Sequence, residues 1–448
     1  MLSPEIQPAV SSPSAPAGEA HAPTPEGDGW DQLGAAVLKA LPPETHVRLL
    51  WLLIAVSIFL RLLWITLPAG SLIFDEKYYV NAARMLAGVA PDADMYQDKP
   101  LGLDPNTEHP PLAKLIVAAS IRMLGDDPIG WRLPSVLFGV AAIVLLYRIG
   151  QRVADDPYVG LVGAAFLAFD NLVFVHSRIF TLDISMLAFM LLGFDLYLRG
   201  HPLGAGGAFA LAALCKLPGG LGILAIAGFE ALRLMREPGR SRAWLALAPG
   251  LSKLIGSCVV IFLVLLTIFD RQWVGYDEPF AHLRYMFSYA QALQRQQPSG
   301  VESYPWQWLW NDVEIPYLKV DQEVKAGDRI VEERPTIFFR GAMNPFVLTL
   351  WPAALGMGAY VWWRRQPGAD VGALVIAWFT ATFLPFLAES LFGHRISYIF
   401  YFLPVLPSIA LGGSYFYLTG GLPRLVLWCY LGAVLVSFIG YFPFRPVS

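Results

Sequence analysis

The sequence predicts an all-α polytopic membrane protein, and two observations lead to that prediction. Of the 448 residues, 56% are hydrophobic and only 15% are charged, a balance that excludes an ordinary soluble domain. Apolar segments close to the length of a spanning helix, about 20 residues, recur along most of the chain. The net charge of -3 gives no indication of nucleic-acid binding. All three cysteines lie in apolar runs, so we expect neither structural disulfides nor a thiolate metal site; they are Cys215, Cys258 and Cys429.

The chain is predicted to begin with a disordered cytoplasmic tail over residues 1–45, followed by one membrane domain over residues 46–448. Residues 1–30 are rich in Pro, Ala, Ser and Gly, and they lack the apolar core of a signal peptide.

Apolar runs predict about 11 spanning helices in the membrane domain. The candidate spans are residues 47–67, 130–149, 158–176, 180–198, 203–215, 219–234, 253–270, 345–363, 371–390, 397–418 and 424–442. The segment Lys216–Gly220 interrupts one of these apolar stretches, and residues 203–215 are short for a full crossing.

Basic residues in the short loops set the predicted orientation, because cytoplasmic loops are enriched in Lys and Arg. Counted from a cytoplasmic N-terminus, one side of the membrane receives Arg148, Arg152, Arg199, Arg233, Arg236, Arg240, Arg242, Lys253, Arg364, Arg365 and Arg424. The other side receives two long loops, residues 68–129 and 271–343. We therefore expect a cytoplasmic N-terminus, an extracytoplasmic C-terminus and two large extracytoplasmic loops.

The first long loop is predicted to contain two short helices lying along the membrane, Tyr78–Leu86 and Pro111–Leu124. The second loop, residues 271–343, is aromatic and polar. No internal repeat is evident, which disfavours a transporter built from duplicated halves.

Two adjacent carboxylates, Asp75 and Glu76, follow the first predicted span. Adjacent carboxylates repel, so burial or a partner cation is expected to push their pKa values apart and leave one group readily ionised. An ionised carboxylate beside a hydroxyl can take its proton as the oxygen attacks. The alternative is an acidic patch at the membrane interface, or a helix cap that pairs with Lys77.

The segment EHPPLAK, Glu108–Lys114, is the second candidate motif. Its two prolines fix the backbone and can begin a helix, so His109 is expected to be held rigidly at the membrane surface. The alternative is an ordinary start of a helix.

Four cationic residues fall at the outer ends of predicted spans, where Lys and Arg run against the usual bias and need an anionic partner. They are Arg132, Arg178, Lys216 and Arg395. Converging cations would suit a phosphate at headgroup depth. The alternative is pairing within the protein, of Arg178 with Asp183 and of Arg395 with Glu389.

Other polar residues have simpler expectations. Asp170, Asn171 and Asp183 should face the protein interior, because such groups are costly in lipid. Asp195 should pair with Arg199, one turn later. Trp306, in the run Tyr304–Trp310, either stacks on a sugar or anchors the loop at the interface.

Several nucleotide and metal motifs are missing: the sequence has no Walker loop, no HExxH and no dinucleotide fingerprint after a strand. If the protein uses an activated donor, a lipid-linked donor is therefore a better candidate than a nucleotide.

Four motifs occur in order along the chain: FDE at Phe74–Glu76, EHPPLAK at Glu108–Lys114, WRLPSVLFG at Trp131–Gly139, and DNLVFVHSRIFTLDISMLAF at Asp170–Phe189. Their order and spacing resemble the protein O-mannosyltransferases, which are GT-C glycosyltransferases of family 39 that use polyprenyl-phosphate mannose. The likeness covers most of residues 70–220. It resumes more weakly at Ser303–Trp310, Asn344–Trp351 and His394–Gly412.

The resemblance implies an 11-helix GT-C enzyme of the plasma membrane, with its active site in the extracytoplasmic loops. Its reaction would be inverting transfer of mannose from polyprenyl phosphate to Ser or Thr hydroxyls of secreted or membrane proteins. Asp75 would be the general base and Glu76 would shape the acceptor site. His109 and Lys114 would lie near the site, and contact with the donor phosphate is expected from Arg132, Arg178 and Lys216.

The chain also departs from the family pattern. Pro218 stands where a variant containing an aromatic residue is more usual, and the large soluble carbohydrate module of fungal and animal members is absent, which implies a bacterial type. The middle of loop 271–343 does not align. A divalent metal is not expected, and the sequence offers no separate carboxylate cluster.

Two alternatives remain open at this point. One is a GT-C enzyme that glycosylates a lipid or polysaccharide, such as those that add aminoarabinose to lipid A. The other is a transporter of a lipid-linked sugar.

Overall fold

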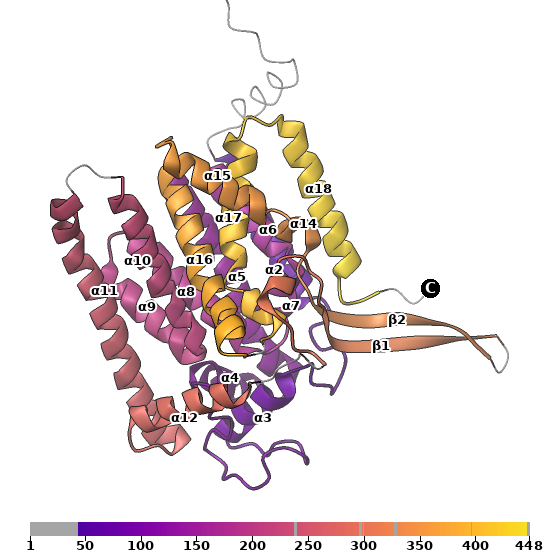
Figure 1. The fold of residues 1–448 in the computed structure, drawn as a ribbon. Coiled ribbons are helices and arrows are strands. Elements are labelled where there is room, and N and C mark those ends of the chain that lie inside the picture. The colour runs from indigo at the N-terminus through magenta and orange to yellow at the C-terminus, as the bar shows by residue number, and fades with distance from the viewer. Residues whose placement is uncertain are drawn as a thin grey trace, which may run out of the picture.

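The computed structural model describes residues 44–236, 240–294, 298, 300–326, 329–395 and 397–445. The predicted N-terminal tail lies almost wholly outside the described residues, so its disorder stays a prediction. Most described residues are helical, and the long helices stand side by side in one bundle (Figure 1).

The bundle helices are α2 (Thr45–Leu62), α5 (Pro128–Ala154), α6 (Pro157–Ala168), α7 (Asn171–His176), α8 (Leu182–Leu198), α9 (Pro202–Cys215), η1 (Leu217–Gly220), α10 (Leu221–Leu234), α11 (Arg240–Phe269), α14 (Pro345–Leu348), α15 (Trp351–Trp363), α16 (Ala369–Phe392), α17 (Leu406–Thr419) and α18 (Arg424–Tyr441). The remaining elements are α3 (Glu76–Ala87), α4 (Leu112–Leu124), η2 (Asp270–Val274), α12 (Pro279–Ala292), α13 (Pro305–Trp308), β1 (Ile315–Ala326), β2 (Arg329–Gly341) and η3 (Ile399–Phe402).

The protein is a multi-pass membrane protein. Among the described residues, 7 helical segments are long and apolar enough to cross a membrane: Thr45–Leu62, Pro128–Ala154, Leu217–Leu234, Leu247–Val274, Pro345–Trp363, Ala369–Phe392 and Arg424–Tyr441. Two shorter apolar helices, α6 and α9, stand beside them. Helices occupy every predicted span, but the count of 11 crossings stays a prediction.

The predicted interruption after Cys215 is confirmed. Helix α9 ends at that residue, Lys216 is extended, and the turn η1 precedes α10. This break places the Lys216 ammonium inside the bundle rather than along a helix face.

Local sequence signals explain where several helices begin. Asp127 accepts hydrogen bonds from the N–H groups of Ile129 and Gly130, and Pro128 occupies the first turn of α5. Asp156 and Pro157 begin α6 in the same way.

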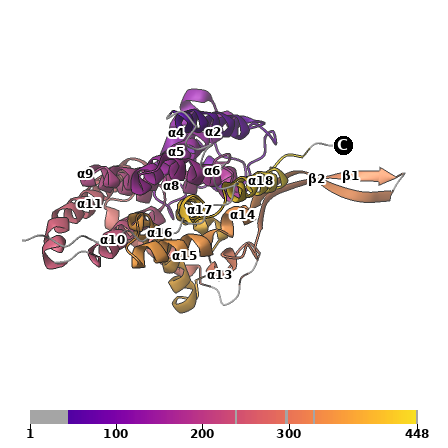
Figure 2. The ribbon, with the colours of Figure 1, turned by 90° about the horizontal axis from the view of Figure 1, so that it is seen from above.

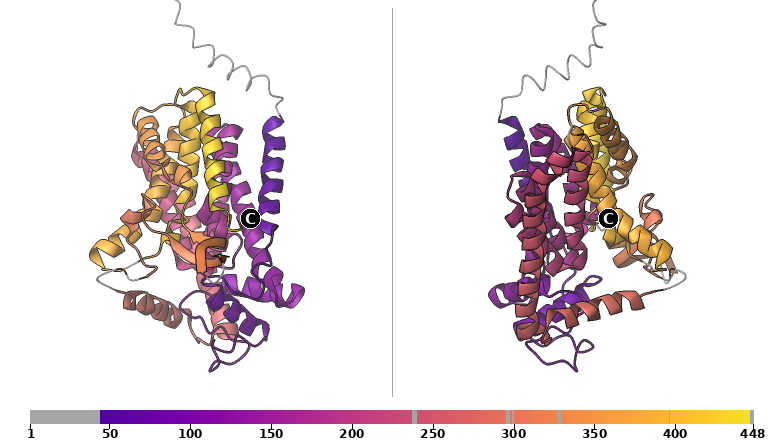
Figure 3. Two further views of the ribbon diagram at one scale, coloured as in Figure 1. Left: turned by 90° about the vertical axis from the view of Figure 1, so that its right-hand side faces the viewer. Right: turned by 60° about the vertical axis from the view of Figure 1, so that its left-hand side comes forward.

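Three helices, α3, α4 and α12, lie across one end of the bundle (Figures 1 and 3). The first two confirm the helices predicted at Tyr78–Leu86 and Pro111–Leu124. Near the opposite end, Asp195 pairs with Arg199 as predicted, and also with Arg148.

A β-hairpin projects sideways from the bundle, as the view from above makes plain (Figure 2). Strands β1 and β2 are antiparallel, with a register that runs from Ile315 opposite Gly341 to Ala326 opposite Arg329. The all-α prediction missed this hairpin. The sequence carried a weak signal, a Gly-Asp dipeptide between two runs with β-branched residues.

The base of the hairpin is tied to the bundle by polar groups. Asn171 donates to the backbone oxygens of Arg340 and Ala342. Asp170 caps α7 and accepts a hydrogen bond from the N–H of Asn344. These residues face the interior as predicted, and they fix the hairpin beside the first loop.

Candidate active site

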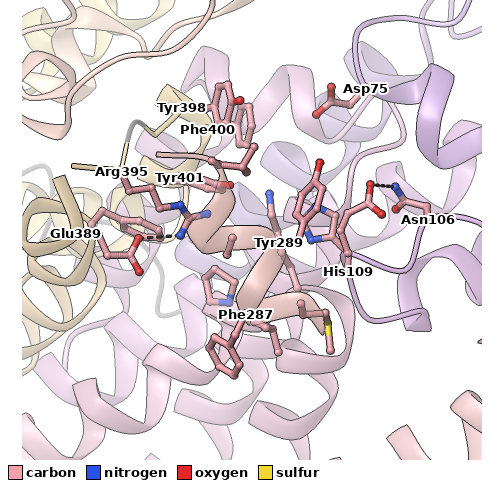
Figure 4. Close-up of a pocket in the computed structure, with 18 of the residues that line it drawn as sticks. Asp75, Asn106, His109, Phe287, Tyr289, Glu389, Arg395, Tyr398, Phe400 and Tyr401 are labelled. Atoms are coloured by element: carbon pink, nitrogen blue, oxygen red, sulfur yellow. Dashed lines mark hydrogen bonds and ion pairs between the residues drawn. The ribbon is translucent and has the colours of Figure 1, made fainter. Parts of the chain in front are cut away.

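A cavity of about 1230 Å³ opens at the end of the bundle that α3 and α12 cover (Figure 4). Its walls come from the first loop, the α9–α10 break, α12 and the segment after α16. Polar and charged groups in the lining include Asp75, Asn106, Glu108, His109, Lys216, Gln291, Gln294, Glu389 and Arg395. Aromatic side chains in the lining include Phe74, Tyr78, Tyr79, Phe287, Tyr289, Tyr398, Phe400 and Tyr401.

Asp75 reaches this cavity from a constrained backbone. The preceding residue, Phe74, has φ of 55°, a left-handed conformation that is rare for a bulky side chain. The Phe74 ring is held in place because it stacks on Tyr317 at 4.1 Å between centroids and meets Phe400 edge-on at 5.9 Å. This packing fixes the start of α3 and with it the carboxylate of Asp75.

The pKa of Asp75 is raised to about 7, mainly because burial disfavours the charged form. The positive charge of Lys216 opposes this shift, and the negative charge of Asp183 adds to it. Asp75 can therefore exchange a proton near neutral pH, as a general base must.

Glu76 points the other way and does not line the cavity. Its carboxylate accepts two hydrogen bonds from Arg132, at 2.9 Å from Nε and 2.8 Å from Nη2. Backbone N–H groups of Ile73 and Phe180 donate to the same carboxylate at 2.8 and 2.9 Å. The side chain is fully buried and held by these hydrogen bonds, and the expectation that Glu76 shapes the acceptor site stays a prediction.

Lys216 lines the cavity and pairs with Asp183, with 2.8 Å between Nζ and Oδ1. Its ammonium also lies 4.7 Å from the ring centroid of Phe400 and 4.9 Å from that of Tyr401. The expected pairing of Arg178 with Asp183 is therefore wrong, since Lys216 takes that place.

His109 lines the cavity beside Tyr79, with 6.0 Å between the ring centroids. Burial, together with the positive charges of Lys216, Lys114 and Arg395, holds the pKa of His109 well below its usual value. The imidazole is therefore neutral at pH 7 and offers one donor and one acceptor to a ligand.

Lys114 does not line the cavity, but it binds the backbone of the segment that carries His109. The ammonium is fully buried, pairs with Asp104 at 2.6 Å and donates to the backbone oxygen of His109 at 3.1 Å. Asn106 donates to Glu108 at 2.6 Å, and burial raises the pKa of Glu108.

Arg395 enters from the far side of the cavity, across from Asp75 and His109 (Figure 4). Its guanidinium pairs with Glu389 at 2.8 Å, as predicted. Arg395 and Lys216 are thus the two predicted cations that reach the cavity.

Arg132 and Arg178 lie elsewhere, and the predicted convergence of four cations is wrong for these two. Arg178 donates to the backbone oxygens of Leu60 and Leu63, both at 2.6 Å. Besides binding Glu76, Arg132 donates to the backbone oxygen of Ile65 at 2.8 Å. The carbonyls at the C-terminal end of α2 lack helical partners and attract cations, which explains both positions.

Trp306 also stays off the cavity lining. It stacks on Tyr304 with 4.4 Å between ring centroids and remains 40% exposed. Whether it stacks on a sugar or anchors the loop stays open.

Sequence reasoning missed three residues in the cavity lining or in the packing behind it, namely Tyr317, His176 and Tyr289. Tyr317 of β1 donates to or accepts from His176 at 2.9 Å, and His176 also bonds Thr181 at 2.7 Å. Tyr289 reaches the cavity from α12. The motif containing His176 was noticed as a whole, but nothing local marked Tyr317 or Tyr289.

Comparison with known proteins agrees with the motifs. Residues 108–268 match the model of the family described as dolichyl-phosphate-mannose-protein mannosyltransferase. The predicted resemblance is therefore confirmed over this part of the chain.

Curated relatives carry a similar description. The polyprenol-phosphate-mannose–protein mannosyltransferase of Mycobacterium tuberculosis is 34% identical over 136 residues, which are 30% of this chain and 24% of that protein. The enzyme of the same name from Mycolicibacterium smegmatis is 32% identical over 127 residues, 28% of this chain and 23% of the relative. The matched segment thus spans about a quarter of these relatives' length.

Solved structures are similar over nearly the whole chain. The S. cerevisiae protein O-mannosyltransferase Pmt1-Pmt2 complex bound to the sugar donor gives a TM-score of 0.66 at 12% identity, over 91% of each chain. ArnT from Cupriavidus metallidurans bound to undecaprenyl phosphate gives 0.51 at 18% identity, over 89% of this chain and 64% of ArnT. The chain has the GT-C fold.

Proposed function

We propose that this GT-C protein is an inverting glycosyltransferase that moves mannose from polyprenyl-phosphate mannose to Ser or Thr hydroxyls of proteins. The observation that carries the proposal is Asp75, a carboxylate with a pKa of about 7 in a cavity that also contains Lys216, Arg395 and a neutral His109. The family match of residues 108–268 and the names of the relatives support the choice of donor and acceptor.

In the proposed reaction the acceptor hydroxyl attacks the anomeric carbon from the face opposite the phosphate. A bond forms between the hydroxyl oxygen and the anomeric carbon while the bond from that carbon to the phosphate oxygen breaks. The electron pair leaves with the phosphate, and Asp75 takes the hydroxyl proton. Lys216 and Arg395 stabilise the charge that develops on the phosphate, and the cavity walls hold the reactants in line.

We place this reaction on the extracytoplasmic side of the plasma membrane. The support is the excess of Lys and Arg in the loops at the other end of the bundle. The cavity opens at the end where α3 and α12 lie, and this end carries the two long loops.

The alternative enzyme is a GT-C transferase that glycosylates a lipid. The fold shared with ArnT is compatible with this alternative. A transporter of a lipid-linked sugar is the third reading. The alternative enzyme would place hexose on a lipid instead of a peptide, and a transporter would transfer no hexose to either.

The test incubates the purified protein with polyprenyl-phosphate mannose and a Ser/Thr-rich peptide and analyses the products by mass spectrometry. We expect one hexose on the peptide. Asp75→Asn should reduce transfer by about 10²- to 10⁴-fold, the range for a lost general base, while donor binding persists. Asp94→Asn, an exposed acid in the same loop, is the matched control and should transfer normally. Hexose found only on lipid would favour the alternative enzyme, and near-normal turnover by Asp75→Asn would refute the base assignment.

No divalent metal takes part in the proposed reaction. Dialysis against EDTA is therefore expected to leave transfer unchanged, and a loss that Mg²⁺ or Mn²⁺ restores would overturn this part of the proposal.

A further inference from the structure

Helix α12, which we call the α12 strap, runs from the end of α11 toward the segment after α16 (Figure 3). Its residues Met286, Phe287 and Tyr289 line the cavity. Just beyond its C-terminal end, Gln294 forms an antiparallel bridge with Arg395. The N-terminal end is fixed differently, by a buried histidine that the proposed reaction does not use.

That histidine, His282, links α12 to the nearby Asp270 of η2 and to Thr107 of the first loop, which lies 175 positions earlier in the sequence. Its Nδ1 lies 2.6 Å from Oδ1 of Asp270, and its Nε2 lies 2.8 Å from the backbone oxygen of Thr107. The side chains of His282 and Asp270 are both fully buried. The ring of Tyr276 stacks flat on the imidazole, with 4.6 Å between centroids and 5° between planes.

The partners of His282 settle where one proton lies. A backbone carbonyl can only accept a hydrogen bond, so Nε2 must carry a proton to bond Thr107. The 2.6 Å contact between Nδ1 and Oδ1 of Asp270 is the second hydrogen bond of the ring. Oδ2 of Asp270 is buried without a hydrogen-bond partner among the described residues.

Thr107 is the residue directly before Glu108 and His109, which both line the cavity. A second contact holds the same loop, because the N–H of Asp104 donates to the backbone oxygen of Trp273 at 2.6 Å. From the other side Lys114 pairs with Asp104 and bonds the backbone of His109. The loop that carries Glu108 and His109 is therefore held between α4 and the junction of α11 with α12.

We propose that His282 is a positioning residue: its hydrogen bond to Thr107 sets the place of the Glu108–His109 loop relative to the α12 strap, and so the shape of the cavity opposite Arg395. This inference rests on the proposed function for its effect on transfer. The competing explanation is that the buried pair of His282 and Asp270 only stabilises the fold.

Two substitutions separate the two hydrogen bonds of His282. The side-chain amide nitrogen of Gln falls near the place of Nε2 in His, whereas that of Asn falls near Nδ1. His282→Gln can keep the bond to Thr107, and His282→Asn can keep only the bond to Asp270. Arg284→Gln, at an exposed position on the same helix, is the control.

The experiment measures kcat, donor KM, thermal unfolding and hydrogen–deuterium exchange of residues 104–110 in the full-length protein. We expect His282→Asn to lower kcat by about 10- to 100-fold, the scale for misplaced reacting groups, and to raise exchange in residues 104–110. His282→Gln should recover kcat to within about threefold of the wild type, since it restores the hydrogen bond.

Equal kcat losses and equal exchange in both variants would overturn the inference and leave a purely structural role. If the wild type transfers no hexose, the proposed function fails, while the exchange of residues 104–110 still decides the positioning role. Asp270→Asn tests the idea independently of how His282→Asn folds. Its amide can donate to Nδ1 while Nε2–H stays on Thr107, so a kcat loss beyond tenfold with unchanged unfolding would contradict the proposal.

Discussion

Asp75 and Glu76 are neighbours in sequence, yet their carboxylates lie in different surroundings. Glu76 turns inward to Arg132 and two backbone N–H groups, whereas Asp75 faces the cavity. Successive residues at the start of a helix point about 100° apart, which separates the two side chains. The carboxylate of Glu76 thus holds the loop to α5, and that of Asp75, the proposed base, faces the cavity.

The pKa of Asp75, about 7, predicts how transfer depends on pH. A general base must be ionised, so activity should rise with pH through about 7. Lys216→Met removes a positive charge that lowers this pKa, so the midpoint of the profile should move to higher pH. The measurement is kcat/KM between pH 5.5 and 9. The double variant Lys216→Met/Asp183→Asn also removes a negative charge that raises the pKa and should shift the midpoint less. A midpoint that stays in place in Lys216→Met would contradict the assignment.

Arg132 is expected to matter for stability rather than for donor affinity. Arg132→Ala leaves the buried carboxylate of Glu76 without its ion partner, which costs about 3–5 kcal/mol of unfolding free energy. Thermal unfolding in detergent measures this loss. Arg395→Gln is the matched comparison, because Arg395 lines the cavity: donor KM should rise with little change in stability. An increase of donor KM in Arg132→Ala without a loss of stability would show that Arg132 contacts the donor after all.

At the scale of the elements, the β-hairpin is connected to the candidate base through Tyr317 and Phe74. Tyr317 of β1 is buried, stacks on Phe74 and bonds His176. The hairpin base therefore supports the backbone from which Asp75 extends, although Tyr317 lies far from that loop in the sequence.

Two substitutions at Tyr317 separate the effect of its stack on Phe74 from that of its hydrogen bond to His176. Tyr317→Phe keeps the stack on Phe74 but leaves Nε2 of His176 without its partner, which should cost about 1–3 kcal/mol of stability. Tyr317→Leu also removes the aromatic stack, and it should lower kcat more than Tyr317→Phe does because Phe74 loses its packing. Unfolding and transfer assays on both variants measure the two effects. Equal kcat in the two variants would argue against a role of the stack.

Elements with local signals could be predicted from the sequence, and long-range contacts could not. Apolar periodicity identified α3 and α4, and the Pro-Gly sequence after Lys216 identified the break before α10. Polar groups at helix ends pointed to Asp75, His109, Lys216 and Arg395, which do line the cavity. Arg132 and Arg178 carry the same local signal, but their partners lie in α2, just after α2 and at the start of α3, and only the folded chain brings these segments together.

For the whole molecule, the predicted orientation can be tested with single cysteines. Cys215 and Cys258 are buried and Cys429 is exposed, so a Cys429→Ser background is needed first. Asp94→Cys, in the first long loop, should react with a membrane-impermeant maleimide in intact cells. Gln366→Cys, between α15 and α16, should react only after the cells are permeabilised. The reverse pattern would place the cavity on the cytoplasmic side.

The left-handed backbone conformation of Phe74 has a consequence for the design of chimeric proteins. Its ring is enclosed by Tyr317 from the hairpin and Phe400 from η3, two segments that lie far away along the chain. A first loop transplanted from another protein with the GT-C fold would lack these two packing surfaces. Working chimeras should therefore exchange the first loop, the hairpin base and η3 together, as one three-part module.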